Sequence, residues 1–247
     1  MADIYSHGVR IHYEVDGEGV PLLLHHGFAV SLTGWRLSNY VEQLKDDYQV
    51  ILLDARGHGA SEKPHDPTAY SPEFMVGDIL AVLDALDVPK VHLWGYSMGA
   101  RIVRDVANTT PERVSSLILG GFGPAPEPMK EALQKGLDAF VEFLDQRMGG
   151  LRPEGRAIFM ANDREALLAC MARPIELTPA LLPAMPCLVY AGEADETFPQ
   201  AKGYAERLPR GRFFSLAGLG HIQAFVRSDL VLPRVKNFLS EVGVKAV

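Results

Sequence analysis

Residues 91–100 read VHLWGYSMGA. The run opens with an apolar segment typical of a strand, continues with the pattern Gly-x-Ser-x-Gly, and leads into a segment at residues 100–109 that favours a helix. Ser97 is therefore expected on the sharp turn between a strand and a helix, with a positive φ. Gly95 and Gly99 suit that turn because they lack the Cβ atoms that would clash in it. The flanking strand and helix make this pattern a specific signal for a nucleophilic serine.

Strands and helices alternate on both sides of this stretch. Apolar runs typical of buried strands lie at residues 20–24, 48–53, 114–119, 187–190 and 212–216. Helical patterns lie between or after these runs, at residues 35–45, 72–86, 200–208 and 229–242. Such alternation predicts an α/β fold in which a mostly parallel sheet carries helices on its faces.

The N-terminal region has a turn signal between two strand-like runs. Residues 9–15 alternate between apolar and polar side chains, and the sequence DGEG at residues 16–19 precedes the apolar run at residues 20–24. The pattern predicts a hairpin that leads the chain into the sheet.

A segment with helical patterns only separates the two strand-rich parts of the chain. No strand is predicted between residues 124 and 186, whereas amphipathic helices are predicted at residues 129–148 and 163–172. The expected organisation is a core made of residues 1–123 and 187–247, with residues 124–186 inserted as a helical lid over the edge of the sheet.

Composition restricts the class of protein. The chain has 247 residues, of which 47% are hydrophobic and 22% charged, close to the average for globular domains. Its net charge of −7 is spread along the chain, and no basic face with interleaved aromatics argues for nucleic acid as a partner. There is no signal-peptide pattern or membrane-spanning apolar run, so a cytoplasmic location without a membrane partner is expected. Cys170 and Cys187 are expected to be reduced packing residues.

Two further residues complete a candidate catalytic set. A serine hydroxyl is a weak nucleophile that needs a base, and the base needs an acceptor that fixes its tautomer. Asp195 and His221 each follow a predicted strand, and sites in open α/β sheets form outside the carboxyl ends of strands. We therefore predict a triad of Ser97, Asp195 and His221. Glu193 and Glu196 flank the aspartate and remain alternative acids.

In this order of serine, aspartate and histidine, the chain resembles the α/β-hydrolase superfamily, in its serine branch of esterases, enol-lactonases and cofactor-free haloperoxidases. HGF at residues 26–28 looks like the oxyanion turn of that family, and DARGHGAS at residues 54–61 resembles its D-x-RGHG-x-S loop. The resemblance implies an α/β-hydrolase fold, with about eight strands and a small helical lid. It also implies that the backbone N–H groups of Phe28 and Met98 form an oxyanion hole.

Large apolar side chains in the core and in the lid are candidates for the substrate pocket. They are Trp35, Phe122, Phe140, Phe143, Phe159 and Met160. The lid also carries several arginines, namely Arg147, Arg152, Arg156, Arg164 and Arg173. Their simplest interpretation is as solvated charges, and the alternative is that one of them binds a substrate carboxylate.

The remaining histidines do not indicate a cofactor. His26 and His58 lie next to glycines in loops, where hydrogen bonds that fix loop shape are their expected task. No group of histidines and carboxylates has the spacing of metal ligands, and no nucleotide-binding glycine pattern follows a strand. The sequence therefore implies neither a cofactor nor a metal.

The predicted activity is hydrolysis of carboxylic esters through an acyl-enzyme, with a small-molecule ester or lactone as the partner. Enol-lactonase or C–C bond hydrolase activity remains open, with perhydrolase or haloperoxidase chemistry as a side activity. A function of another class, a small-molecule receptor with slow turnover, also remains open. Haloalkane dehalogenases and epoxide hydrolases of this fold carry an aspartate at the elbow, so Ser97 disfavours those reactions.

Overall fold

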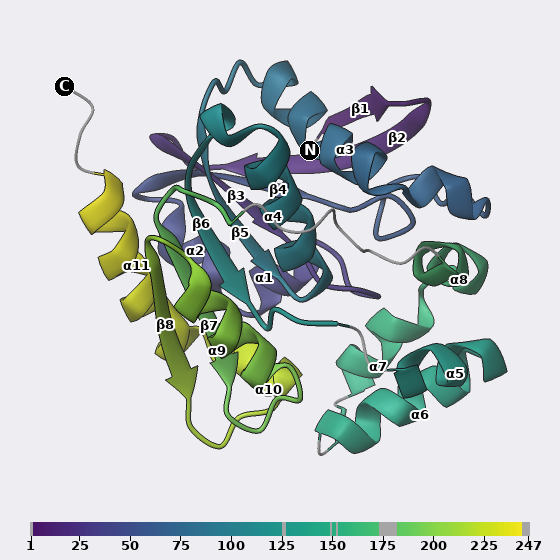
Figure 1. The fold of residues 1–247 in the computed structure, drawn as a ribbon. Coiled ribbons are helices and arrows are strands. Elements are labelled where there is room, and N and C mark those ends of the chain that lie inside the picture. The colour runs from purple at the N-terminus through teal and green to yellow at the C-terminus, as the bar shows by residue number, and fades with distance from the viewer. Residues whose placement is uncertain (1, 125–126, 149, 152, 173–181, 244–247) are drawn as a thin grey trace.

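The computed structural model describes residues 2–124, 127–148, 150–151, 153–172 and 182–243 (Figure 1). At its centre is an eight-stranded sheet with the order β1-β2-β4-β3-β5-β6-β7-β8. The strands are β1 (Ala2–Ser6), β2 (Val9–Asp16), β3 (Val20–His25), β4 (Tyr48–Leu53), β5 (Val91–Tyr96), β6 (Val114–Gly120), β7 (Cys187–Gly192) and β8 (Gly211–Leu216). Strands β3 to β8 are parallel, whereas β2 is antiparallel to β1 and β4. The predicted mostly parallel sheet is confirmed.

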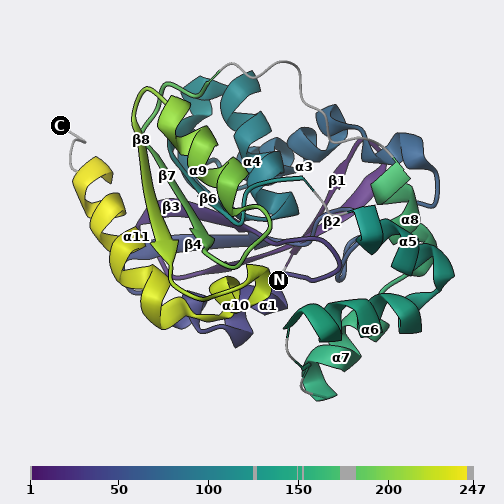
Figure 2. The same cartoon turned by 60° about the horizontal axis from the view of Figure 1, so that its bottom comes forward.

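Helices cover both faces of this sheet, as Figures 1 and 2 show. On one face lie α3 (Pro72–Ala85), α4 (Met98–Thr109) and α9 (Phe198–Arg207), and on the other lie α1 (Thr33–Leu37), α2 (Tyr40–Leu44) and α11 (Ser228–Gly243). Successive residues of β5 point to opposite faces, so Leu93 belongs to the first core and Trp94 to the second. Within the described ranges, no helix has the length and apolarity needed to cross a bilayer.

The N-terminal strands pair differently from the sequence prediction. β2 forms its hairpin with β1, through a two-residue turn in which His7 has a φ of 49° and Gly8 a φ of 76°. β3 pairs with β4 and β5 instead of β2. The hairpin predicted for residues 9–24 is therefore wrong. The fully apolar part of β3 needs cover on both faces and so lies at the centre of the sheet, while the alternating β2 lies nearer the edge.

Two of the predicted helices are each divided into two shorter ones. The helix predicted at residues 35–45 is broken by Asn39, whose φ is 62°, into α1 and α2. The helix predicted at residues 129–148 is broken by Gly136, whose φ is 131°. Glycine adopts such a backbone angle at low cost, so the break at Gly136 is local in origin.

The described part of residues 124–186 contains four helices. They are α5 (Glu127–Lys135), α6 (Leu137–Met148), α7 (Pro153–Met160) and α8 (Arg164–Ala172). Figures 1 and 2 both show them grouped at one side of the sheet. Phe140, Phe159 and Leu167 form their apolar core, which packs against Ala29 and Phe28 just after β3. This group of helices therefore lies over the loop that follows the carboxyl end of β3.

Candidate active site

Ser97 occupies a sharp turn between β5 and α4. Its φ is 55° and its ψ is −113°, so the positive φ expected from the sequence is present. A Cβ atom on Gly95 would lie 2.3 Å from the Gly99 carbonyl oxygen, and one on Gly99 would lie 2.2 Å from the His25 carbonyl oxygen. The Ser97 N–H donates to the Gly120 carbonyl at 2.8 Å, which fixes the turn to β6. The two glycines are needed because other backbone segments pass directly against the turn.

Asp195 and His221 are brought together from two separate loops. Asp195 follows β7, and His221 is the first residue of α10 (His221–Val226). His221 Nδ1 lies 2.6 Å from Asp195 Oδ2, and the Thr197 N–H donates to the other carboxylate oxygen at 2.9 Å. Burial raises the pKa of Asp195, but the hydrogen bond and charge of His221 outweigh it, so this pKa lies below its usual value. The ionised carboxylate therefore accepts a hydrogen bond from Nδ1–H, which leaves Nε2 of His221 without the proton and able to act as a base.

The two alternative acids point elsewhere. Glu193 accepts a hydrogen bond from the Ser215 hydroxyl at 2.7 Å. Glu196 forms an ion pair with Arg147 on α6, and both side chains are largely exposed. Asp195 is thus the carboxylate that the described structure places against His221.

His221 lies at the same edge of the sheet as Ser97. A Cβ atom on Gly121 would lie 2.8 Å from Cε1 of His221, and Gly121 follows the residue that accepts the hydrogen bond of Ser97. The Tyr96 hydroxyl donates to the His221 carbonyl, and the two rings lie 5.3 Å apart. Among the described residues, the Ser97 hydroxyl makes no hydrogen bond. Catalytic hydrogen bonds in free enzymes are often long and tighten when substrate binds.

The turn at residues 26–28 packs against the elbow. A Cβ atom on Gly27 would lie 3.4 Å from the Cβ of Ser97 and 4.0 Å from its hydroxyl oxygen. The Met98 N–H is free of the helix ladder because Met98 begins α4, and within the described ranges neither it nor the Phe28 N–H has an acceptor. Two N–H groups close to the serine are therefore available to an oxyanion.

His26 fixes the shape of this turn. Its Nδ1 donates to the Gly27 carbonyl at 2.7 Å, and its Nε2 accepts from the Ala55 N–H at 3.0 Å. Burial lowers the pKa of His26 to about 3, so the ring is neutral and has one donor and one acceptor. Both nitrogens are used, which agrees with the structural task predicted for His26.

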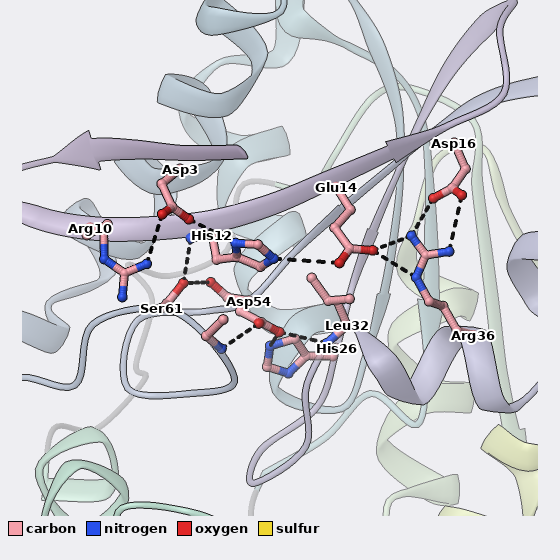
Figure 3. Close-up of polar contacts among 11 residues, drawn as sticks. Asp3, Arg10, His12, Glu14, Asp16, His26, Leu32, Arg36, Asp54 and Ser61 are labelled. Carbon is pink, nitrogen blue, oxygen red and sulfur yellow. Dashed lines mark hydrogen bonds and ion pairs between the residues drawn. The ribbon is translucent and has the colours of Figure 1, made fainter. Parts of the chain in front are cut away.

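The loop at residues 54–61 contacts the turn at residues 26–28 and the start of α1 through hydrogen bonds. The Asp54 carboxylate accepts from the Leu32 N–H at 2.8 Å and from the Ala60 N–H at 2.7 Å, and Figure 3 shows it facing Leu32 and His26. Ser61 continues the network, because its hydroxyl donates to the Asp54 carbonyl at 2.7 Å and accepts from the His12 N–H at 2.8 Å. Asp54 therefore ties the start of α1 to this loop.

Arg56 and His58 complete the same loop. The buried Arg56 donates to both oxygens of the Asp78 carboxylate, at 2.7 and 2.6 Å, and to the Ala69 carbonyl at 2.5 Å. His58 Nδ1 donates to the Arg56 carbonyl at 3.0 Å, and burial lowers the pKa of His58 to about 4. The neutral His58 ring lies 5.6 Å from that of Phe28. His58 thus has a structural hydrogen bond, as predicted.

The predicted pocket residues do not form one group. Trp35 has no exposed surface, because it packs against Tyr40, Trp94 and Phe225 on the face covered by α11. Its assignment to the pocket is therefore wrong.

The other five candidates for the pocket differ in how far they are buried and in what they contact. Phe122 is 7% exposed and packs on Tyr204, while Phe140 and Phe159 are buried in the lid core. Phe143 is partly buried beside the Arg147 guanidinium, and Met160 is 40% exposed. Phe143 and Met160 thus have more solvent-accessible surface than the other three.

The described lid arginines all have partners. Arg147 pairs with Glu196, Arg156 lies 3.5 Å from Glu142, and Arg164 lies 2.7 Å from Glu165. Arg152 and Arg173 lie outside the described residues.

Sequence reasoning missed a different arginine, Arg101 on α4. Its Nε is buried and has no hydrogen-bond partner in the described structure. Its place four residues after Ser97, on a helix rich in buried side chains, is the feature of the sequence that could have indicated it.

Comparison with known proteins agrees with this architecture. The profile of the alpha/beta hydrolase fold matches residues 20–153, more than half of the chain. A putative non-heme bromoperoxidase, BpoC, from Mycobacterium tuberculosis is 27% identical over 95% of this chain and 99% of that protein. The solved structure of the enol-lactonase from Burkholderia xenovorans LB400 has a TM-score of 0.84 and 25% identity, over 97% of this chain and 100% of that one.

Other similarities extend over only part of the related protein. A putative 2-succinyl-6-hydroxy-2,4-cyclohexadiene-1-carboxylate synthase from Bacillus subtilis is 33% identical over 56% of this chain and 55% of that protein. The matched region spans about a third to just over half the length of several curated relatives.

Proposed function

Because the chain belongs to the α/β hydrolase fold family, we propose that it is a serine hydrolase that cleaves carboxylic esters. The observation that carries the proposal is the 2.6 Å pairing of His221 with Asp195 beside a serine held at positive φ. The φ of 55° and ψ of −113° at Ser97 lie outside the left-handed helical region that Asn39 adopts, with a φ of 62° and a ψ of 19°. A backbone conformation of this kind costs on the order of 1–3 kcal/mol and is typical of functional sites.

The mechanism follows from the roles of these groups. His221 Nε2 takes the proton of the Ser97 hydroxyl, and the serine oxygen attacks the ester carbonyl. The N–H groups of Phe28 and Met98 stabilise the tetrahedral oxyanion, and His221 then gives its proton to the leaving alcohol. Water, activated by His221, attacks the acyl-enzyme and releases the acid. Asp195 holds the imidazole in the required tautomer and stabilises its protonated form.

Lactones are a second substrate class for the same chemistry. The whole-chain likeness to an enol-lactonase supports this class, and the bromoperoxidase relative supports perhydrolysis as a side activity. Both would use the same nucleophile, because a lactone is a cyclic ester and a peracid can arise when hydrogen peroxide replaces water at the acyl-enzyme.

A labelling experiment tests the proposal. A fluorophosphonate probe should label the wild-type protein, and p-nitrophenyl acetate and butyrate should release nitrophenol. Ser97→Ala should abolish labelling and turnover because the nucleophile is lost. Ser240→Ala is the matched control, since Ser240 is exposed on α11. If the wild type is not labelled and hydrolyses no short acyl ester or lactone, the proposal is wrong.

A further inference from the structure

Arg101 is a cation with a buried, unpaired nitrogen on the helix that carries the nucleophile. Within the described ranges, its Nε has no hydrogen-bond acceptor. We infer that Arg101 binds a carboxylate of the substrate, so that the preferred substrates are esters or lactones with a free carboxylate in the acyl part. The inference rests on the proposed function, because it concerns substrate selection at the same site.

The position of Arg101 places its side chain toward the elbow. Its N–H donates to the Ser97 carbonyl at 3.3 Å, so it lies one helical turn beyond the nucleophile, or about 6 Å along the axis. Cα–Cβ bonds in a helix tilt toward the N-terminus, and a long side chain therefore covers the preceding turn. The preceding turn of α4 is the one that begins at Ser97 and Met98.

Its surroundings place it between the core and the lid. Burial lowers the pKa of Arg101, and the neighbouring groups that act on its charge are Cys170, Arg104 and Asp105. Cys170 belongs to α8 of the lid. Arg101 thus lies where a lid helix meets the elbow helix, in the part of the molecule that borders Ser97.

Asp105 favours the charged form of Arg101, but within the described ranges none of these neighbours forms an ion pair or hydrogen bond with the guanidinium. Burial raises the pKa of Cys170 to about 12, so this thiol is uncharged. Asp105 lies 3.3 Å from Arg104, and burial raises the pKa of Asp105 to about 7. A guanidinium stays protonated in proteins, so Arg101 carries a charge that the described protein does not pair. Arg101 is partly buried, and the removal of its Nε from water has a free-energy cost that a hydrogen-bond acceptor would offset.

Arg56 shows how the same fold satisfies a structural arginine. Arg56 is fully buried, whereas Arg101 is partly buried with a buried Nε, and Arg56 bonds to both oxygens of Asp78 and to a backbone carbonyl. Arg101 lacks any equivalent in the described structure. The difference indicates that the partner of Arg101 comes from a ligand.

A carboxylate fits this guanidinium better than other anions. Guanidinium and carboxylate form two parallel hydrogen bonds, and one cation balances one negative charge. Arg104 is already shared with Asp105 and the Phe122 ring, so it does not supply the second charge that a phosphate dianion would need.

The test uses two p-nitrophenyl esters of matched acyl length, the anionic mono-p-nitrophenyl adipate and the neutral p-nitrophenyl hexanoate. The wild type should have the higher kcat/KM for the adipate ester. Arg101→Met should lower the adipate-to-hexanoate ratio of kcat/KM by about 10- to 100-fold, mainly through KM, since it removes charged hydrogen bonds to the substrate.

Arg104→Met is the matched control, because Arg104 lies on the same helix but is paired. It should leave the adipate-to-hexanoate ratio unchanged. An unchanged ratio in Arg101→Met would overturn the inference while leaving the hydrolase proposal intact, whereas a wild type that hydrolyses neither ester would overturn the hydrolase proposal.

An inhibition measurement on the wild type tests the inference even if Arg101→Met fails to fold. Free adipate should inhibit hydrolysis of the hexanoate ester competitively, and neutral hexanamide should inhibit it far less. Equal inhibition by the two compounds, or none by adipate, would also overturn the inference.

Discussion

In the loop at residues 54–61 most polar groups are hydrogen-bonded, with the buried His58 Nε2 as an exception, whereas several polar groups at the edge of the sheet around Ser97 have no partner in the described structure. In the loop, the Asp54 carboxylate and the Arg56 guanidinium are each held by two or more protein groups. At the edge, the Ser97 hydroxyl, the Phe28 and Met98 N–H groups and Arg101 Nε have no hydrogen-bond partner within the described ranges. The paired groups fix the shape of the site, and the unpaired groups are the ones available to a substrate.

An unpaired polar atom alone does not mark a site. Trp35 Nε1 and Asn108 Oδ1 are also buried without a partner in the described structure, yet Trp35 lies in the core under α11 and Asn108 at the far end of α4. What distinguishes the edge is that several unpaired groups gather at the carboxyl ends of neighbouring strands, where parallel sheets bind ligands.

The largest effect is expected from the one carboxylate that serves the reaction. Asp195→Asn should lower kcat by about 10⁴-fold without unfolding the protein, because the amide favours the wrong histidine tautomer. Steady-state kinetics measures the loss of kcat, and circular dichroism checks that the variant is folded. Glu196→Gln is the control, since Glu196 pairs with Arg147 at the surface. If Glu196→Gln caused the same loss and Asp195→Asn did not, the acid would have been assigned wrongly.

A stability change is expected from the loop. Asp78→Ala should lower the free energy of unfolding by about 3–5 kcal/mol, because it leaves Arg56 buried and unpaired. Asp84→Ala on the same helix should cost only about 0–1 kcal/mol, since the Asp84–Arg113 pair is exposed. Urea unfolding compares the two. Similar values for both variants would remove the distinction between the loop and an ordinary surface ion pair.

A smaller effect is expected from the buried histidines beside the oxyanion turn. The pKa of His58 is about 4 when folded, against about 6.5 for an exposed histidine, so the unfolded chain binds a proton first as the pH falls. His58 therefore lowers stability progressively between about pH 6.5 and 4, by at most about 3 kcal/mol. Thermal unfolding across this range should show a shallower slope in His58→Gln. An equally steep slope would mean that His58 does not titrate in this way.

Features that depend on neighbouring residues could be predicted from the sequence. The elbow at residues 95–99 carries its own strand, glycines and helix, and the continuous apolar runs of β3 to β7 indicate strands covered on both faces. The pairing of β2 could not be predicted in this way, because its partner β4 lies more than thirty residues further along the chain. A hairpin with the next strand was the simplest interpretation of a local turn signal.

The site residues that were wrong or missed depended on distant contacts. Trp35 is an aromatic residue shortly after the turn at residues 26–28 in sequence, but only the positions of Tyr40 and Phe225 decide that it packs away from solvent. Arg101 differs from Arg56 only by what surrounds it, and the sequence does not show that one meets Asp78 while the other meets no acceptor in the described structure.

The most direct test of this account is to trap the acyl-enzyme. Wild-type protein is mixed with p-nitrophenyl butyrate, quenched in acid during turnover, digested, and analysed by mass spectrometry. A butyryl group on the peptide that contains Ser97 is the predicted result. Turnover of the ester with no acyl group on Ser97, or with the group on another residue, would contradict the account.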